Sequence, residues 1–246
     1  MNSGYDDISL EYGILSRELT VKKYAEEFTF LKVLGDVKGR TVLDLACGEG
    51  RFTRKIRKRG ARHVVGVDIS ENMIGLARTA ERKNPVGAEY VVCDVASLGK
   101  IGAFDIVSAA FLFNYASSQE TLLAMCRAAY DNLKSGGKLA ACINATPLYP
   151  PGNSDITRKY GYIIKSPMPL HEGNPVEYSF FSKKYSFRIV NYHWSKETYE
   201  WALRKSGFAE ITWQTPIISL KGIQKYGVGF WQDFLKEPNF VCIRCT

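Results

Sequence analysis

The chain has 246 residues, of which 46% are hydrophobic, and a formal net charge of +8. This length suits one α/β domain with an elaboration, and the hydrophobic content is ordinary for a globular protein with a large core. No apolar run approaches the ~18 residues of a membrane span, and the acidic segment 1–7 differs from a signal peptide. We therefore expect a soluble, cytoplasmic protein and no membrane partner.

The six cysteines are scattered along the chain. Only Cys242 and Cys245 have a spacing that resembles a metal site, and no second pair lies near them in the sequence. Buried or terminal thiols are therefore favoured over a metal centre, and we expect no bound metal.

The N-terminal part, residues 1–38, predicts helices. Residues 5–12 are consistent with an amphipathic helix that packs Ile8 and Tyr12 against the rest of the domain. A second predicted helix covers residues 21–34, where aromatic and aliphatic residues recur at four- and three-residue steps. This helix would bring Tyr24 near the turn that follows the first strand.

The central feature of the sequence is the stretch 41–50, which reads T-V-L-D-L-A-C-G-E-G. Residues 42–45 are apolar apart from Asp44, and such a short run before glycines predicts a buried parallel strand. Gly48 and Gly50 allow the backbone to turn sharply and to approach a ligand closely. A helix is expected from Arg51, with its N-terminus toward the same ligand. Together they predict a cradle of the nucleotide-binding kind.

The residues of this turn also restrict its ligand. A dinucleotide site requires G-x-G-x-x-G and a phosphate loop requires G-x-x-x-x-G-K-[ST], but Gly50 is followed by Arg51 and Phe52. The Asp44 carboxylate would repel a pyrophosphate, whereas it pairs well with an ammonium group. A ligand with positive charge and no phosphate points to S-adenosylmethionine.

The stretch D-L-A-C-G-E-G at 44–50 resembles the first motif of the class I S-adenosylmethionine-dependent methyltransferases, with Ala46 where glycine is commonest. Later landmarks follow in the family's order: strands that end at Asp68 and Asp94, a fourth strand from Phe104, and L-K-S-G-G-K at 133–138. The resemblance implies a Rossmann-like seven-stranded sheet, mostly parallel with its last strand antiparallel and flanked by helices. It assigns the cofactor-binding core to residues 39–145.

The resemblance also implies roles for individual residues. Asp68 would bind both ribose hydroxyls and Asp94 the adenine amino group, with Ile69 and Met73 beside the adenine. Tyr5 and Tyr12 match a segment that folds over the cofactor as a lid in many small-molecule methyltransferases, so the N-terminal helix has a packing and a lid interpretation. The residues expected to bind S-adenosyl-L-methionine, or its product S-adenosyl-L-homocysteine, are Tyr12, Tyr24, Asp44, Ala46, Gly48, Gly50, Asp68, Ile69, Met73, Asp94, Val95, Ala110, Phe111 and Tyr115.

The remaining core elements are predicted in order. Ser70 is expected to cap a helix over 71–82, and the fourth strand to run over 104–113 and end at Asn114 and Tyr115. Since ligands lie beyond the carboxyl ends of strands in an open α/β sheet, these two residues should face the methyl-transfer site. A helix over 119–133 and a strand over 138–144 follow.

Beyond Asn144 the sequence contains prolines, aromatic residues and alternating segments, which predict antiparallel strands in a substrate cap over residues 146–194. Ser195 is expected to cap a helix over 196–205 that Gly207 ends. Two strands, 210–218 and 240–245, should complete the core in residues 195–246.

The cap is rich in aromatic residues. Most would pack it against the sheet, but flat aromatic walls also suit a planar aromatic or heterocyclic small molecule. The segment 193–208 resembles small-molecule methyltransferases of the toxoflavin N-methyltransferase type. The residues expected to bind substrate are Tyr5, Asn114, Asn144, Tyr149, His193 and Trp194.

Methyl transfer is an in-line displacement, so proximity and alignment can supply most of the acceleration. If the acceptor must lose a proton, His193 and His171 are candidate bases, with Tyr115 and Tyr149 as orienting groups. The predicted catalytic set is His193, Tyr115 and Tyr149. The sequence does not distinguish a nitrogen, oxygen or carbon acceptor.

Every charged residue between Arg51 and Arg62 is basic. The alternation of these residues with Phe52 and Ile56 favours a solvated helix face over a nucleic-acid site. Two alternatives remain open: a tRNA or rRNA methyltransferase that uses helix 51–62, and a non-catalytic cofactor-binding regulatory subunit. The oligomeric state is not determined by the sequence.

Overall fold

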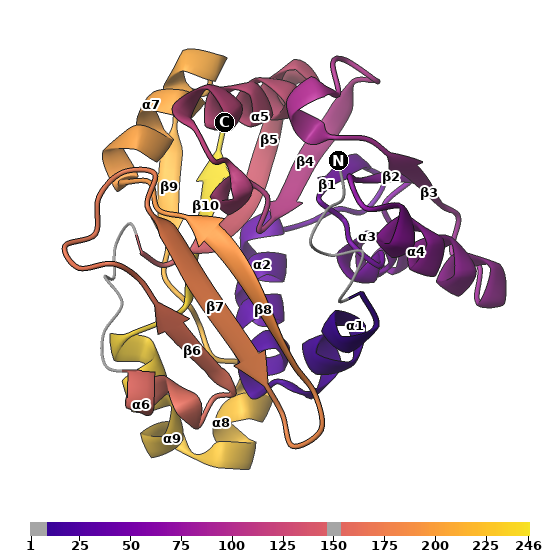
Figure 1. Ribbon diagram of the computed structural model, residues 1–246. Coiled ribbons are helices and arrows are strands. Elements are labelled where there is room, and N and C mark those ends of the chain that lie inside the picture. The colour runs from indigo at the N-terminus through magenta and orange to yellow at the C-terminus, as the bar shows by residue number, and fades with distance from the viewer. Residues whose placement is uncertain (1–8, 147–153) are drawn as a thin grey trace.

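The computed structural model describes residues 9–146 and 154–246 and has a seven-stranded sheet at its centre (Figure 1). The strand order is β3-β2-β1-β4-β5-β10-β9. Strands β1–β5 are parallel, and β10 runs antiparallel to both β5 and β9, so the predicted Rossmann-like sheet is confirmed. The strands are β1 (Thr41–Leu45), β2 (His63–Asp68), β3 (Ala88–Val92), β4 (Phe104–Ala110), β5 (Leu133–Asn144), β9 (Ile211–Gln214) and β10 (Phe240–Cys245).

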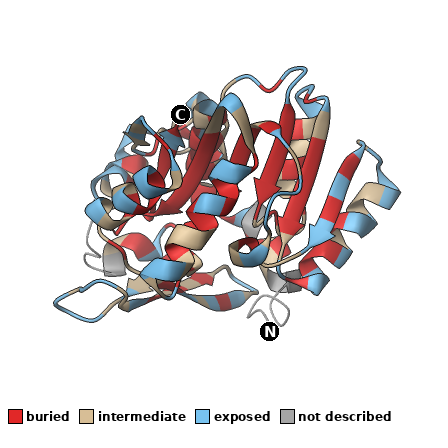
Figure 2. Cartoon of the chain, turned by 90° about the horizontal axis from the view of Figure 1, so that it is seen from above, coloured by how far each residue is buried: buried red, intermediate tan, exposed pale blue. Residues whose placement is uncertain are grey.

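Alternate side chains of the central strands enter two different cores. Leu43 and Leu45 pack with α5 (Gln119–Asp131) and α7 (Lys196–Ser206) on one face of the sheet. Val42 packs with α2 (Glu27–Leu34) and α3 (Arg51–Lys58) on the other. Figure 2 shows this sheet as the most continuously buried part of the molecule. Because side chains alternate along a strand, Asp44 shares the face of Val42 and lies on the side of α3.

Local capping explains where several helices begin. The hydroxyl groups of Ser70 and Ser195 accept hydrogen bonds from the backbone N–H groups of Met73 and Thr198, as expected for N-caps. Ser70 precedes α4 (Glu71–Lys83), which covers β2 and β3, and Ser195 precedes α7. At the other end of α7, Gly207 has a φ of 122°.

The N-terminal part differs in detail from its prediction. The first helix, α1, covers Ser9–Glu18, and the predicted helix over 21–34 is present but begins with a π-helical turn, η1 (Lys22–Glu26), that leads into α2. The π-turn buries both Lys22 and Glu26, four residues apart. The expected start of the first helix, and with it Tyr5, lies outside the described residues, as does Tyr149.

The fourth strand is shorter than predicted. It ends at Ala110, because Phe111 has a φ of 65° that turns the chain out of the sheet. Residues 113–115 then form the 3₁₀ turn η3 (Phe113–Tyr115) rather than the end of a strand. Between β9 and β10 the structure adds two helices that the sequence analysis missed, α8 (Leu220–Tyr226) and α9 (Val228–Lys236).

The predicted antiparallel cap is present as a separate three-stranded sheet in the order β6-β7-β8. Its strands are β6 (Tyr162–Lys165), β7 (Pro175–Phe181) and β8 (Ser186–Tyr192), preceded by α6 (Ser154–Arg158). Many of the aromatic side chains of the cap region are buried in the core. The Tyr160 ring, for example, stacks on Trp231 of α9 at a centroid distance of 6.1 Å.

Two cysteines correct the prediction of free thiols. Cys142 and Cys242 form a disulfide, because the antiparallel register of β5 and β10 places them directly opposite each other. Within the described residues the other four, Cys47, Cys93, Cys126 and Cys245, are free, and no group of three or more His, Cys, Asp or Glu side chains is suited to hold a metal ion.

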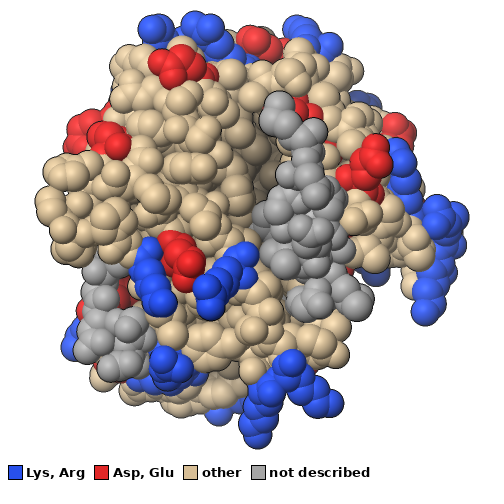
Figure 3. Space-filling view, viewed as in Figure 1, with Lys and Arg blue, Asp and Glu red and all other residues tan. Residues whose placement is uncertain are grey.

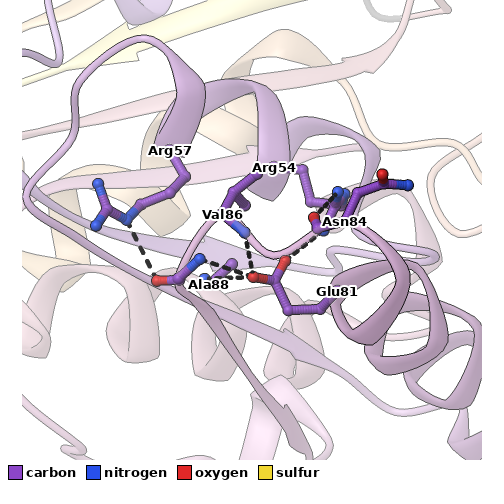
Figure 4. Close-up of polar contacts among 7 residues, drawn as sticks. Arg54, Arg57, Glu81, Asn84, Val86 and Ala88 are labelled. Carbon is purple, nitrogen blue, oxygen red and sulfur yellow. Dashed lines mark hydrogen bonds and ion pairs between the residues drawn. The ribbon is translucent and has the colours of Figure 1, made fainter.

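The basic helix α3 is much less solvated than predicted. Glu27 of α2 pairs with Arg51, at 2.6 Å, and with Lys55. Arg54 pairs with Glu81 of α4 and donates to the Asn84 carbonyl oxygen at 2.7 Å (Figure 4). The side chains of Arg51 and Arg54 are only 17% and 14% exposed.

Over the described ranges, no helix combines the length and apolarity needed to cross a membrane.

Replacing Arg54 with glutamine should lower the free energy of unfolding by roughly 1–2 kcal/mol, because it removes charged hydrogen bonds to Glu81 and Asn84. Lys58→Gln, on the same helix at an exposed position, is the matched control and should change it by less than about 0.5 kcal/mol. Urea denaturation measures both. Equal effects of the two substitutions would show that the Arg54 contacts do not stabilise the fold.

Candidate active site

The turn between β1 and α3 depends on two glycines for different reasons. Gly48 has a φ of 55°, and a Cβ built on it meets no protein atom within 4 Å. A side chain there would be strained and would project into open space. Gly50 has a φ of 79°, and its Cβ would lie 2.5 Å from the Tyr90 hydroxyl oxygen. Gly48 therefore keeps a cavity open, whereas Gly50 permits close packing on β3.

Asp68, at the end of β2, holds this turn in place. One carboxylate oxygen accepts a hydrogen bond from the Gly48 N–H at 2.7 Å, and the other accepts from the Ser70 N–H at 3.0 Å. The carboxylate thus joins the turn after β1 to the beginning of α4. A residue expected to bind ribose also shapes the turn beside it.

Asp44 is the most buried acid of the site, with 1% of the residue exposed. The Thr53 hydroxyl of α3 donates to it at 2.6 Å, and the Ser108 hydroxyl of β4 donates to its other oxygen. Burial disfavours the charged carboxylate and raises the pKa of Asp44 to about 6, although both hydroxyl groups oppose this shift. Asp44 is therefore mostly ionised at neutral pH and neutral in mild acid.

Three adjoining cavities lie at the carboxyl ends of β1, β2 and β4, and Tyr12 and Phe111 line all three. The turn cavity contacts the glycine turn, Asp44 and Glu26. The β2 cavity adds Asp68 and Met73. The third, here called the asparagine chamber, lies between the main sheet and the cap sheet and is lined by Tyr12, Lys22, Glu26, Phe111, Asn114, Tyr115, Asn144, Tyr178, Phe180, Ile189, Asn191 and Asn239.

Most of the residues expected to bind the cofactor meet at these cavities. Those lining the turn cavity, the β2 cavity or both are Tyr12, Asp44, Ala46, Gly48, Asp68, Met73, Ala110, Phe111 and Tyr115. Gly50, Ile69, Asp94 and Val95 line none of the three. The Asp94 carboxylate instead accepts from the Ala96 N–H at 2.9 Å and caps a short turn. Asn114 and Asn144, expected to bind substrate, line the asparagine chamber.

Three expected site residues lie elsewhere. The ring of Tyr24 packs on Tyr226 of α8, 5.7 Å between centroids, because the π-turn directs Glu26 rather than Tyr24 to the cavities. Trp194 is 5% exposed and donates its indole N–H to the Ala116 carbonyl oxygen at 2.8 Å, which makes it a core residue. His193 lines none of the three cavities. Burial lowers its pKa, with Glu172 opposing the shift.

Other lining residues were missed by the sequence analysis. Lys22 and Glu26 are four residues apart on a predicted helix, a spacing that places two side chains on one face and was a usable signal. Asn191 of β8 and Asn239 before β10 have no comparable local signal. They reach the chamber only through the pairing of distant strands.

The cavity residues fit S-adenosylmethionine. Space beside Gly48 is open, and two carboxylates, Asp44 and Asp68, line adjoining cavities that also contain the apolar side chains Ala110 and Phe111. Asp44 would attract the cofactor's ammonium group, and Asp68 can accept hydrogen bonds from hydroxyl groups. No phosphate-binding loop accompanies them.

Comparison with known proteins agrees with this geometry. Residues 42–137 match the model of a methyltransferase domain family. A solved S-adenosylmethionine-dependent methyltransferase from Mesorhizobium loti has the same fold, with a TM-score of 0.65 at 20% identity over 89% of this chain and 96% of that one. Residues 42–137 thus resemble a methyltransferase domain, and the fold is that of a solved S-adenosylmethionine-dependent methyltransferase.

Curated relatives of this methyltransferase domain differ in what their names describe. A ubiquinone biosynthesis O-methyltransferase of Coxiella burnetii is 33% identical over 104 residues, 42% of this chain and 43% of that protein. An N-demethylindolmycin N-methyltransferase of Streptomyces griseus is 29% identical over 173 residues, 70% of each. The match spans less than half of the Coxiella protein and of a Haemophilus influenzae relative.

Asp68→Ala should weaken binding of S-adenosylhomocysteine by ~1–3 kcal/mol, because the turn loses its anchor and the ligand loses a charged acceptor. Titration calorimetry measures this difference. Asp131→Ala, at an exposed position on α5, is the control and should bind as the wild type does. An unchanged affinity in Asp68→Ala would refute the role given to this carboxylate.

The affinity for S-adenosylmethionine should fall as the pH drops below about 6, because Asp44 then takes up a proton and loses the charge that attracts ammonium. The decrease should approach about tenfold per pH unit. Asp44→Asn should bind more weakly at pH 8 and lose this pH dependence. If the affinity of the wild type and of Asp44→Asn depended on pH in the same way between pH 5 and pH 8, Asp44 would not be the group that attracts the ammonium.

Proposed function

We propose that this methyltransferase domain transfers the methyl group of S-adenosylmethionine to a nitrogen or oxygen atom of a small planar molecule, aromatic or heterocyclic. The main support for this proposal is that the turn cavity and the asparagine chamber adjoin. Tyr12, Glu26 and Phe111 line both the turn cavity and the asparagine chamber. A cofactor beside Gly48 would therefore lie next to a cavity for a second molecule.

The names of the relatives support a small-molecule acceptor and leave its atom open. One relative is named as an O-methyltransferase of ubiquinone biosynthesis and the other as an N-methyltransferase of N-demethylindolmycin. Either an N- or an O-methyl acceptor is compatible with the cavities. The asparagine chamber has lining residues of its own, such as Asn144 and Asn191, that do not line the turn cavity.

The protein contributes mainly alignment. When bound, S-adenosylmethionine supplies an electrophilic methyl carbon on a positively charged sulfur. Asp44, Asp68 and the turn hold the cofactor at the strand ends, while Tyr12 and Phe111 border both cavities. Holding both reactants in contact can supply much of the acceleration. His193 does not line any of the three cavities.

The RNA alternative has less support. The basic residues Arg51, Arg54 and Lys55 are paired with acids of α2 and α4, so their charge is largely compensated within the protein. Figure 3 shows one face of the molecule with Lys and Arg mostly toward its edges and with Asp and Glu among them. No continuous basic surface is visible on that face.

The proposal is tested with S-adenosylmethionine that carries a labelled methyl group. Purified protein is incubated separately with a small-molecule extract, total RNA and total protein from the source cells. We expect label in a small organic product, which mass spectrometry identifies, and less product from Asp68→Ala at the same cofactor concentration. Label in RNA would contradict the proposal, and no label in any fraction would favour the non-catalytic alternative.

A further inference from the structure

The asparagine chamber contains buried polar atoms that the protein itself does not satisfy. Within the described residues, Oδ1 and Nδ2 of Asn114, the Tyr178 hydroxyl and Oδ1 of Asn239 have no hydrogen-bond partner. These residues are 0%, 1% and 5% exposed, and all three line the chamber. Buried polar groups are nearly always paired in native proteins, so this concentration in one cavity indicates a ligand that pairs with them.

The three groups come from elements far apart in the sequence. Asn114 follows β4, Tyr178 belongs to β7 of the cap sheet, and Asn239 precedes β10. The cap is fixed against the main sheet beside them, since Nδ2 of Asn144 donates to Oδ1 of Asn191 at 2.9 Å. The polar groups therefore belong to a chamber of defined shape.

The charge of the chamber is balanced without a ligand. Nζ of Lys22 lies 3.8 Å from the Glu26 carboxylate, and both residues are buried. Burial lowers the pKa of Lys22, but Glu26 and Tyr12 outweigh this effect and hold it above its ordinary value. The ammonium group also lies 4.8 Å from the centroid of the Tyr12 ring. An ionic ligand would have to compete with this pair, so a neutral ligand is favoured.

The unpaired groups specify a ligand with both donors and acceptors. An asparagine side chain presents a carbonyl oxygen and an N–H donor in one plane, complementary to another planar amide edge. Burial raises the pKa of Tyr178 well above its ordinary value, so its hydroxyl stays neutral and can donate or accept. Phe111 and Phe180 add flat apolar walls to the same chamber.

On the basis of the proposed function, we propose that the methyl acceptor is a neutral planar cyclic amide with N–H and C=O groups on one edge, bound by Asn114, Tyr178 and Asn239. In the transfer the bond between the sulfonium sulfur and the methyl carbon breaks and a bond from that carbon to the amide nitrogen or oxygen forms. The amide N–H proton is released to solvent, and S-adenosylhomocysteine leaves as a neutral thioether. A purely aromatic molecule would leave these polar atoms buried and unpaired, which is unfavourable. A carboxylate or an amine would disturb the Lys22–Glu26 pair. The asparagines, more than the aromatic residues of the cap, then select the substrate class.

Titration calorimetry on the protein saturated with S-adenosylhomocysteine tests this inference with defined probes. These are 2-pyridone and uracil as cyclic amides, N-methyl-2-pyridone as the matched compound without N–H, and benzoate and benzylamine as ionic compounds. We expect the cyclic amides to bind at least about tenfold more tightly than the other three. Equal or tighter binding of benzoate or benzylamine, or no binding of either cyclic amide, would overturn the proposal.

Variants then locate the binding groups. Tyr178→Phe and Asn114→Leu should each weaken 2-pyridone binding by about tenfold, with S-adenosylhomocysteine affinity within about twofold of the wild type as a check on folding. Tyr162→Phe is the matched control, because Tyr162 is equally buried in the cap but does not line the chamber. Unchanged 2-pyridone binding in both chamber variants would place its site elsewhere and refute the inference.

The outcomes separate this inference from the proposed function. Binding of cyclic amides with no methyl transfer to any small molecule would leave the ligand class of the chamber standing and reject the enzymatic function. Methyl transfer to an acid or an amine, without binding of cyclic amides, would retain the function and reject the ligand class.

Discussion

The Asp44 carboxylate connects the three elements that form the proposed cofactor site. It lies next to the last residue of β1, a strand whose residues are all buried, and accepts hydrogen bonds from Ser108 of β4 and Thr53 of α3. These contacts fix the direction in which the chain leaves β1, so the glycine turn opens toward the strand ends. Asp68 completes the arrangement from β2 by holding the Gly48 N–H. Two carboxylates thus shape a pocket and give it negative charge, which disfavours phosphates and favours a cationic cofactor.

The sequence predicted this part of the molecule well because its signals are local. A short apolar run, closely spaced glycines and a following helix lie within a few turns of chain, and Ser70 and Ser195 mark helix starts through contacts three residues away. The sheet could be predicted because several strand–turn–helix units of this kind follow one another along the chain. The predicted end of β4 was wrong because one residue, Phe111, adopts a left-handed backbone conformation. Aromatic residues rarely adopt this conformation.

The features that the sequence did not reveal depend on contacts between distant segments. Trp194, a predicted substrate residue, donates its indole N–H to a carbonyl group 78 residues away in the chain. Tyr24 was displaced by a π-turn, a rare irregularity with no reliable sequence signal. Cys142 and Cys242 are paired through a strand register that joins positions 100 residues apart. The basic helix was expected to be solvated because its acidic partners lie on other helices.

The structure of the cap differs most from the expectation about substrate selection. Its aromatic residues suggested a flat apolar pocket, yet several of them fill the space between the cap and the C-terminal helices. The chamber combines Phe111 and Phe180 with four asparagines and three tyrosines. Among the described residues of the chamber, Asn114, Asn239 and Tyr178 carry buried polar atoms without a hydrogen-bond partner. Selection by hydrogen bonds is sharper than selection by apolar contact alone, because a wrong ligand leaves buried polar groups unpaired.

We propose that the glycine turn and its two carboxylates bind S-adenosylmethionine rather than a phosphate-bearing nucleotide. Calorimetric titration of the purified protein with S-adenosylhomocysteine, NADH and ATP, each alone and in competition, tests it most directly. We expect saturable binding of S-adenosylhomocysteine that neither NADH nor ATP displaces. Tight binding of NADH or ATP at this site, or no binding of S-adenosylhomocysteine, would contradict it.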